Sequence, residues 1–188
     1  MEIISRVKSI LVSPKEEWQT IEAENAPHAK VFTSYVVPLA LIPAIAALVG
    51  YGLISSVLGI GWGIRQAIVQ YVVMLGGTYI TAFIINALAE NFGAKKDFDR
   101  AFSLTAYAYT PMFVAGVFYL LPSLSWLASL AGGLYSLYLL YIGLQPMMKV
   151  PADRQTTYFV ISLIATVVVS GILSVVFTAI LLQGTFGM

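Results

Sequence analysis

The sequence has no cysteine and few charged residues. Without cysteine the chain has no disulfide, no thiolate metal ligand and no cysteine nucleophile. Only 10% of its 188 residues are charged, whereas soluble domains carry about 25%. So few charges do not cover a water-facing surface, and we therefore expect lipid to surround most of the chain. The length suits one compact membrane domain.

The sequence also lacks the motifs of common enzymes and cofactor-binding proteins. No GxSxG elbow, HExxH motif, P-loop or dinucleotide fingerprint is present. His28 is the only histidine, and its Ala-Pro-His-Ala linker holds no second residue at metal-ligand spacing. The net charge of +1 gives no basic patch for nucleic acid. We predict that the protein is not an enzyme and binds no cofactor, metal or nucleic acid.

What the sequence does contain is a series of long apolar runs. A helix needs about 20 apolar residues to cross the hydrocarbon of a bilayer. Five segments meet this length, at residues 31–56, 66–89, 101–121, 124–144 and 156–182. We predict an all-α polytopic membrane protein, in which residues 31–183 form a five-helix transmembrane domain. A prokaryotic protein of this kind would lie in the plasma or inner membrane.

Proline and glycine divide these runs. Pro38 and Pro43 interrupt the first span and Pro111 the third, while Pro122-Ser123 predicts a tight turn into the fourth. The glycine-rich segment 59–63 is predicted as a loop before the second span. Because it does not follow a strand, it is a weak phosphate-binding signal.

The distribution of basic residues predicts the orientation. Cytoplasmic segments of membrane proteins carry the excess of Lys and Arg. With five spans, one side receives nine of the ten basic residues, and the other receives only Arg65. The nine are Arg6, Lys8, Lys15, Lys30, Lys95, Lys96, Arg100, Lys149 and Arg154. We therefore predict that the N-terminus lies in the cytoplasm and the C-terminus outside.

Residues 1–30 precede the first span and predict two amphipathic helices. Apolar residues recur at helical spacing over residues 1–12. The second helix begins at Ser13-Pro14, where Ser13 and Glu16 are spaced as a capping box. Trp18 and Ile21 share its apolar face. We predict that these helices lie in the headgroup layer with Trp18 as an anchor. Two alternatives are that they cover the end of the bundle or dock a partner.

Inside the membrane, the sequence offers uncharged polar groups rather than charges. The middles of the five spans contain no Asp, Glu, Lys, Arg or His, which argues against a proton relay or a voltage sensor. Pro111 leaves the carbonyl of Tyr107 without its helical partner, and we expect a nearby hydroxyl to replace it. This part of the third span is either a kinked packing site or the wall of a small-molecule or lipid cavity.

Further side chains are candidates for contacts. Phe98 lies in the loop before the third span and, with Tyr138 and Tyr141 of the fourth span, is a candidate lipid or partner contact. Asp97 is placed to cap the third span's helix. In the fifth span, small hydroxyl residues recur every four positions and predict close helix packing. These are Ser162, Thr166, Ser170, Ser174 and Thr178.

Three stretches of the sequence resemble a known family. The opening Arg6-Val7-Lys8-Ser9-Ile10-Leu11-Val12-Ser13-Pro14-Lys15-Glu16-Glu17-Trp18, the Ala-Tyr-Ala-Tyr-Thr-Pro run at 106–111, and the Tyr-Leu-Leu-Tyr-Ile-Gly-Leu-Gln run at 138–145 resemble prokaryotic members of the Yip (Ypt/Rab-interacting protein) family. The resemblance implies a five-span bundle with a cytoplasmic N-terminus. In eukaryotes the family implies vesicle trafficking and small-GTPase binding. The short N-terminal region and the missing Asp-Leu-Tyr-Gly-Pro motif argue against GTPase binding here.

Two functions remain open from the sequence. The first is a non-enzymatic membrane scaffold or interaction protein, in contact with lipid, with other membrane proteins or with a second copy of itself. The second is a small-molecule, ion or lipid transporter or channel built on the proline-broken first and third spans. A polar cavity near Pro111 would favour the second function, and a closely packed bundle there would favour the first.

Overall fold

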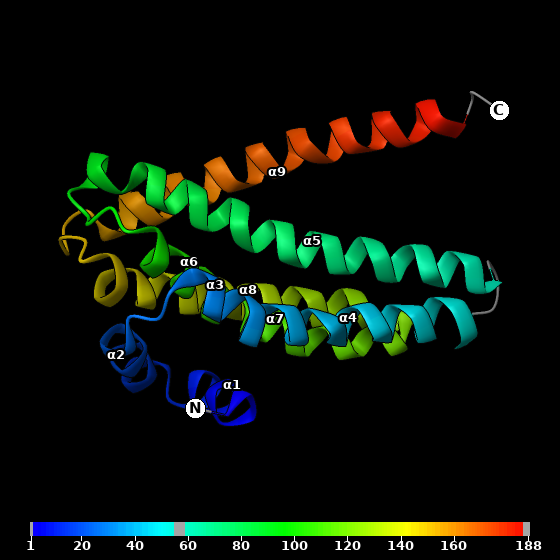
Figure 1. Ribbon diagram of the computed structural model, residues 1–188, viewed down its shortest axis with the longest axis horizontal. Helices are drawn as coiled ribbons and strands as arrows, with labels where there is room; N and C mark the ends of the chain where they lie inside the picture. Colours follow the sequence, from blue (N-terminus) through cyan, green and yellow to red (C-terminus); the bar gives the residue numbers. More distant parts are fainter. Residues whose placement is uncertain (1, 55–58, 186–188) are drawn as a thin grey trace.

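The computed structural model describes residues 2–54 and 59–185, with side chains as far as Ile172. Over these residues the chain is helical and contains no strand. In this part, five segments are long and apolar enough to cross a membrane: His28–Ile54, Gly59–Phe92, Phe98–Leu120, Pro122–Met148 and Gln155–Ile172. The predicted all-α fold with five membrane-spanning helices is confirmed. The spans run along the long axis of the molecule, with their connections at its two ends (Figure 1).

The first span changes helical geometry near its prolines. It consists of α3 (His28–Val31), a π-helical segment (Phe32–Val36), α4 (Val37–Val49) and a second π-helical segment (Gly50–Ile54). Pro38 has no backbone N–H and therefore cannot donate the regular helical hydrogen bond. The first π-helical segment ends just before it. The π-helical geometry accommodates the missing hydrogen bond at Pro38, so the helix continues through the proline as one span.

The second span begins earlier than predicted. It consists of α5 (Gly59–Leu88) and a 3-10 turn (Ala89–Phe92). The predicted loop at residues 59–63 is therefore wrong, because these residues form the first turns of α5. The reason is close packing: a Cβ atom on Gly63 would lie 2.5 Å from Gly52 Cα and 2.8 Å from the Leu48 carbonyl oxygen. The glycines let two helices cross in backbone contact.

The third span is broken at its proline. It contains α6 (Phe98–Ala108), α7 (Thr110–Ala115) and a 3-10 segment (Gly116–Leu120). The Thr110 hydroxyl donates to the carbonyl oxygen of Tyr107 at 2.7 Å. This is the predicted hydroxyl partner for the carbonyl that Pro111 leaves free, and the prediction is confirmed. Asp97 also caps α6 as predicted, accepting from the Arg100 backbone N–H.

The fourth span packs tightly on the third at the kink. It is formed by α8 (Pro122–Met148), which starts with Pro122 at its first position. A Cβ atom on Gly132 would lie 3.0 Å from the Pro111 carbonyl oxygen. One on Gly116 would lie 2.4 Å from Pro43 Cβ, which brings the first span to the same region. Spans one, three and four therefore make close contacts around Pro111.

The fifth span, α9 (Gln155–Thr185), separates from the other helices along its length (Figure 1). Ser162 is buried, and the Thr166 hydroxyl donates to its carbonyl oxygen at 2.8 Å. Ser170 is half-buried. Ser174 and Thr178 lie outside the described side chains. Apolar side chains between Val160 and Ile172 are exposed, so the described part of the hydroxyl row packs on the bundle at its N-terminal end.

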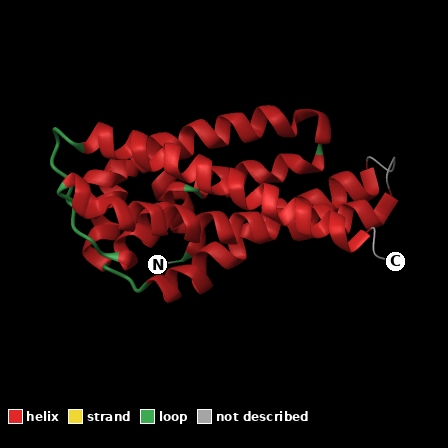
Figure 2. Cartoon of the chain, turned by 90° about the horizontal axis from the view of Figure 1, so that it is seen from above, coloured by secondary structure: helices red, strands yellow, loops and turns green. Residues whose placement is uncertain are grey.

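The two helices before the first span lie at one end of the bundle. They are α1 (Ile3–Val12) and α2 (Pro14–Glu24), and together we call them the N-terminal hairpin. Loops 93–97 and 149–154 lie at the same end (Figures 1 and 2). We call it the basic end, because nine of the ten Lys and Arg residues belong to these segments or border them. Arg65, near the start of α5, belongs to the opposite end.

Candidate functional site

The N-terminal hairpin is the candidate site, and its local sequence explains its two helices. Pro14 occupies the first position of α2 as predicted. The capping box is not formed, because the Ser13 side chain makes no capping hydrogen bond. Ser13 instead sits in the turn between the helices, with its backbone N–H bonded to Ser9 and φ/ψ angles of −132° and 59°. The conformation is not the extended one that an N-cap side chain needs.

The apolar face of the hairpin is buried against the bundle. Trp18 is 1% exposed and Ile21 2% exposed. A Cβ atom on Gly143 of α8 would lie 2.5 Å from the Trp18 ring, so indole and helix are in direct contact. Trp18 and Ile21 are therefore internal contacts rather than a headgroup anchor or an open docking face. Of the alternatives left open, covering the end of the bundle matches this arrangement.

Replacement of Gly143 with alanine tests this contact. The added methyl group would meet Trp18 and Leu104 at 2.5–2.7 Å. We expect overpacking of about 1–3 kcal/mol, which should weaken the docking of the hairpin. Hydrogen exchange of the α2 amides in nanodiscs should accelerate. Gly133→Ala on the same helix is the control, because its Cβ would have no neighbour within 4 Å. Equal exchange in the two variants would contradict the contact.

Arg6 is the buried cation of the hairpin among the residues that the structure describes. It is 4% exposed and forms ion pairs with Glu17 and Glu24 of α2. Burial alone would lower the pKa of Arg6, but the hydrogen bond to Glu24 and the nearby negative groups outweigh it and raise that pKa. Arg6 therefore stays charged and ties α1 to α2.

A chain of polar contacts leads from Arg6 into the bundle. Its guanidinium carbon lies 5.5 Å from the centroid of the Tyr107 ring, within the range of a cation–π interaction. The Tyr107 and Tyr35 rings are 4.6 Å apart, and the hydroxyl oxygens of Tyr35 and Thr110 are 2.6 Å apart. Thr110 is the residue that satisfies the freed carbonyl at the kink. The hairpin is thereby connected to the proline-broken part of the third span.

A small cavity of about 120 Å³ lies beside this chain of contacts. Arg6, Glu24, Lys30 and Tyr107 are among the residues that line it. The exposed Lys30 side chain, the Arg6–Glu24 ion pair and the Tyr107 side chain make this cavity polar. Among the residues that the structure describes, no three His, Asp or Glu side chains gather to hold a metal ion.

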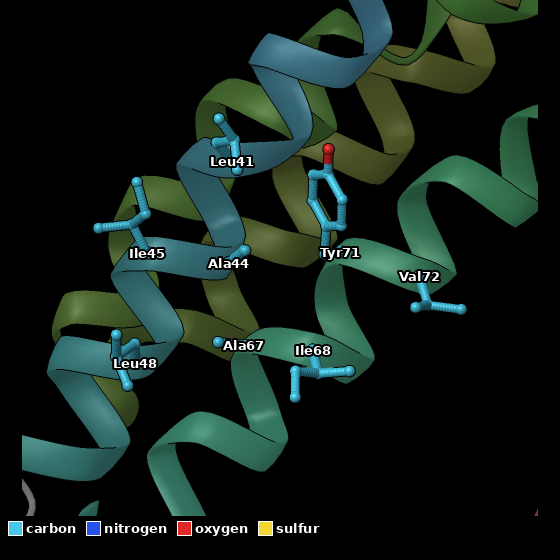
Figure 3. A pocket seen from close by; sticks show the side chains of 8 residues that line it. All are labelled: Leu41, Ala44, Ile45, Leu48, Ala67, Ile68, Tyr71 and Val72. Atoms are coloured by element: carbon cyan, nitrogen blue, oxygen red, sulfur yellow. The ribbon is translucent and has the colours of Figure 1, made fainter.

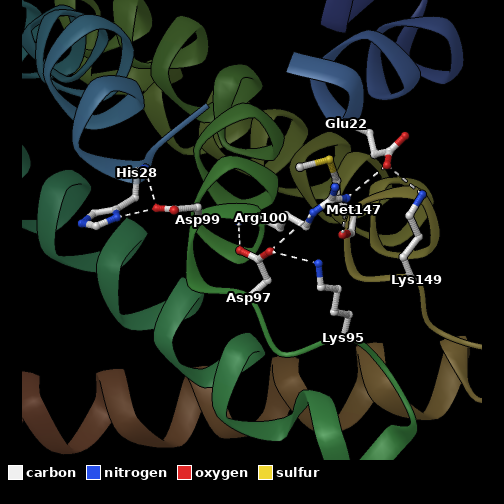
Figure 4. A network of polar contacts seen from close by, with 8 residues as sticks. All are labelled: Glu22, His28, Lys95, Asp97, Asp99, Arg100, Met147 and Lys149. Carbon is white, nitrogen blue, oxygen red and sulfur yellow. Dashed lines mark hydrogen bonds and ion pairs between the residues drawn. The ribbon is translucent and has the colours of Figure 1, made fainter. Parts of the chain in front are cut away.

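A second polar network joins the hairpin to the two loops of the basic end (Figure 4). Glu22 of α2 lies 2.9 Å from the Lys149 ammonium group and 3.2 Å from the Arg100 guanidinium group. Asp97 pairs with Arg100 at 3.6 Å and with Lys95 at 3.7 Å. The network links α2, the start of the third span and the end of the fourth span.

The pH dependence of hairpin docking follows from Glu22. Hydrogen bonds from Lys149 and Arg100 lower the pKa of Glu22 below its ordinary value of 4.5. Its pairs therefore stabilise docking fully above pH 4.5 and lose this effect as the pH falls through the lowered pKa. We expect α2 amide protection to decline below pH 4.5. Glu22→Gln should remove this contribution, and an identical acid response in that variant would contradict the prediction.

His28 lies in the segment predicted as a linker, but in the structure it contacts the start of the third span. Its Nδ1 atom and its backbone nitrogen lie 2.6 and 2.7 Å from Asp99 Oδ1. Phe98 packs edge-on against the His28 ring at 5.2 Å and also contacts Phe102. Phe98 therefore belongs to an aromatic cluster that joins spans one and three.

The two tyrosines predicted in the fourth span lie apart from the Arg6 cluster. Tyr138 is 45% exposed and stacks on Tyr135, whose hydroxyl donates to the Leu11 carbonyl oxygen of α1 at 2.7 Å. Tyr141 contacts the fifth span, with its hydroxyl oxygen 3.1 Å from that of Thr156. Tyr107 and Pro111 are thus near the hairpin's polar chain, whereas Tyr138 and Tyr141 mark other helix contacts.

Sequence reasoning missed the ion pairs of Arg6. The sequence places Arg6 among the predicted cytoplasmic basic residues, and no acidic partner is predicted for it. One signal was available: Arg6 lies three residues after Ile3 and four before Ile10, which places a charge on the apolar face of α1. A charge at such a position needs a buried partner. The identity of that partner depends on the turn between the helices.

Five spans and a docked polar hairpin define a polytopic α-helical membrane protein. Residues 8–182 match the Yip1 domain, and the chain therefore belongs to the Yip1 family. It is similar to the inner membrane protein YohC of Escherichia coli K12, with 29% identity over 166 residues, or 82% of this chain and 85% of YohC. The match to YohC of E. coli O6:H1 strain CFT073 has the same extent. No solved structure matches the chain.

Proposed function

We propose that the chain is a non-enzymatic interaction protein of the inner membrane that binds other membrane proteins through its N-terminal hairpin. The observation that carries the proposal is the burial of Arg6 and Trp18. A hairpin held in place by these residues presents its outer face already ordered, which reduces the entropy lost when a partner binds.

The location and orientation are part of the proposal. The name of YohC places that relative in the inner membrane. The excess of Lys and Arg at the basic end favours a cytoplasmic position for the hairpin. Its partners would then be the cytoplasmic segments of neighbouring membrane proteins or of a second copy of this chain. We do not propose a small GTPase as a partner.

The binding surface would be the outer face of α2, formed by Lys15, Glu16, Gln19, Thr20 and Ala23. All five residues are exposed. One basic and one acidic side chain are followed by neutral ones, so the face suits a polar partner with mixed charge. We call these five residues the hairpin surface.

The transporter alternative needs space between the third and fourth spans near Pro111. At that position Gly132 of α8 packs on the Pro111 carbonyl group. The close packing of the described residues at this position does not support a transporter. Solute flux in liposomes that Gly132→Leu abolishes, while the hairpin stays docked, would reverse this preference.

Site-specific photo-crosslinking tests the proposal. A benzophenone amino acid at Gln19 should form adducts with membrane proteins or a second copy in intact cells. The same probe at Val168, an exposed apolar position of α9, is the lipid-facing control. Trp18→Ser should remove the Gln19 adducts by releasing the hairpin. The proposal fails if Gln19 gives no protein adduct, or gives the same adducts after Trp18→Ser.

A further inference from the structure

The first and second spans form an apolar groove on the outside of the bundle. The groove has a volume of about 300 Å³ and lies between α4 and α5 (Figure 3). Leu41, Ala44 and Ile45 line it from α4, and Ala67, Ile68 and Tyr71 line it from α5. Exposed apolar side chains surround it, so in the membrane it opens to lipid tails rather than to water.

The shape of the groove follows from the size of its residues. At the end of the groove farther from the basic end, Gly52 and Gly63 bring the two helix backbones into contact. Farther toward the basic end, Ala67 lies level with Leu48 and Ala44 lies level with the base of Tyr71, and the two alanines line the groove with short side chains (Figure 3). The Tyr71 ring lies beyond them, level with Leu41. The helices thus enclose a trough that starts at a glycine contact and ends at an aromatic ring.

A cation stands beside this groove. Arg65 precedes Ile68 by three residues and Val72 by seven, so the three share one face of α5. Arg65 is exposed, and its guanidinium carbon lies 5.5 Å from the Trp62 ring centroid. Among the described residues, no acidic side chain forms an ion pair with it. Arg65 lies away from the basic end, whereas every other Lys and Arg lies at or beside that end.

We propose that this groove and Arg65 bind one anionic phospholipid in the leaflet opposite the basic end. The phosphate would accept hydrogen bonds from the Arg65 guanidinium group, and one acyl chain would lie along Ala44 and Ala67. Charge complementarity selects the headgroup, and the apolar trough below it selects a chain. A volume of about 300 Å³ is at the small end of ligand pockets, which suits one chain rather than a whole lipid.

Tryptophan quenching by brominated lipids measures this binding. A Trp126→Phe variant leaves Trp62 as the tryptophan in contact with lipid, because Trp18 is buried. In mixed vesicles, brominated phosphatidylglycerol should quench Trp62 at about a fivefold lower mole fraction than brominated phosphatidylcholine, the preference expected from one cation near the surface. Trp126, measured in a Trp62→Phe variant, is the exposed control and should show no preference.

Two substitutions separate the headgroup contact from the groove. Arg65→Gln should abolish the phosphatidylglycerol preference, and Ala67→Leu should raise the mole fraction of brominated phosphatidylglycerol that quenches Trp62 by filling the trough. Ala131→Leu on the exposed side of α8 is the matched control and should leave it unchanged. Equal quenching of Trp62 by the two lipids, or a preference that survives Arg65→Gln, would overturn the proposal. Quenching of Trp62 at an unchanged mole fraction of brominated phosphatidylglycerol in Ala67→Leu would overturn the acyl-chain groove. Helical content by circular dichroism checks that each variant is folded.

Discussion

Replacement of Arg6 with alanine should release the N-terminal hairpin from the bundle. Arg6 and Glu17 are both buried, and their side chains are 5% and 9% exposed. Removing the cation leaves the Glu17 carboxylate buried without a countercharge, which costs about 3–5 kcal/mol. The opening equilibrium of the hairpin should therefore rise at least about 100-fold. Hydrogen exchange of the α2 amides in nanodiscs measures this change.

Two variants show whether the effect comes from the orphaned charge. Lys8→Ala removes an exposed cation from the same helix and should leave the exchange rates unchanged. Arg6→Ala combined with Glu17→Gln should recover much of the protection, because the second substitution removes the unpaired carboxylate. Native exchange rates in Arg6→Ala would show that the ion pairs do not hold the hairpin.

Replacement of Gly50 with valine should disrupt the contact between the first and third spans. A Cβ atom on Gly50 would lie 1.8 Å from the Tyr119 carbonyl oxygen and 2.8 Å from its carbon. Both atoms belong to the backbone, so no side-chain rotation relieves the clash. We expect a loss at or above the usual overpacking range of about 1–3 kcal/mol. The thermal midpoint and the yield of monodisperse protein in detergent should both fall.

Gly76→Val is the matched control for this prediction. A Cβ atom on Gly76 would have no neighbour within 4 Å, so the substitution adds the same volume on an open face of α5. Its thermal midpoint should stay near that of the unmodified chain. Equal losses in both variants would indicate a general cost of valine at a helical glycine rather than the contact of Gly50 with Tyr119.

The overall architecture could be predicted from the sequence because apolar length and charge distribution act over whole segments. Five spans follow from five runs of about 20 apolar residues, and small shifts of their ends do not change the count. Local rules with short-range partners also succeeded. Asp97 caps the helix that follows it, and Thr110 satisfies the carbonyl freed by Pro111.

The errors arose where tertiary contacts decide the outcome. Glycine in segment 59–63 predicted a loop, but Gly63 is needed for the crossing with Gly52. Tryptophan is a common anchor at membrane interfaces. Trp18 nevertheless packs on Gly143, because the turn at Ser13 folds α2 back onto the bundle. The candidate site was recognised only in part for the same reason. Tyr107 was identified, whereas its neighbour Arg6 depends on the docking of the hairpin.

The five-span arrangement requires the N-terminal hairpin and Arg65 to lie on opposite sides of the membrane. The chain has no cysteine, so single cysteines at Lys15, Lys95 and Arg65 can be labelled without background. A membrane-impermeant maleimide applied to intact spheroplasts should label Arg65→Cys at once, and Lys15→Cys and Lys95→Cys only after permeabilisation. Labelling of Arg65→Cys and Lys95→Cys from the same side would contradict the five-span arrangement. Labelling of Lys15→Cys from outside would contradict a cytoplasmic hairpin.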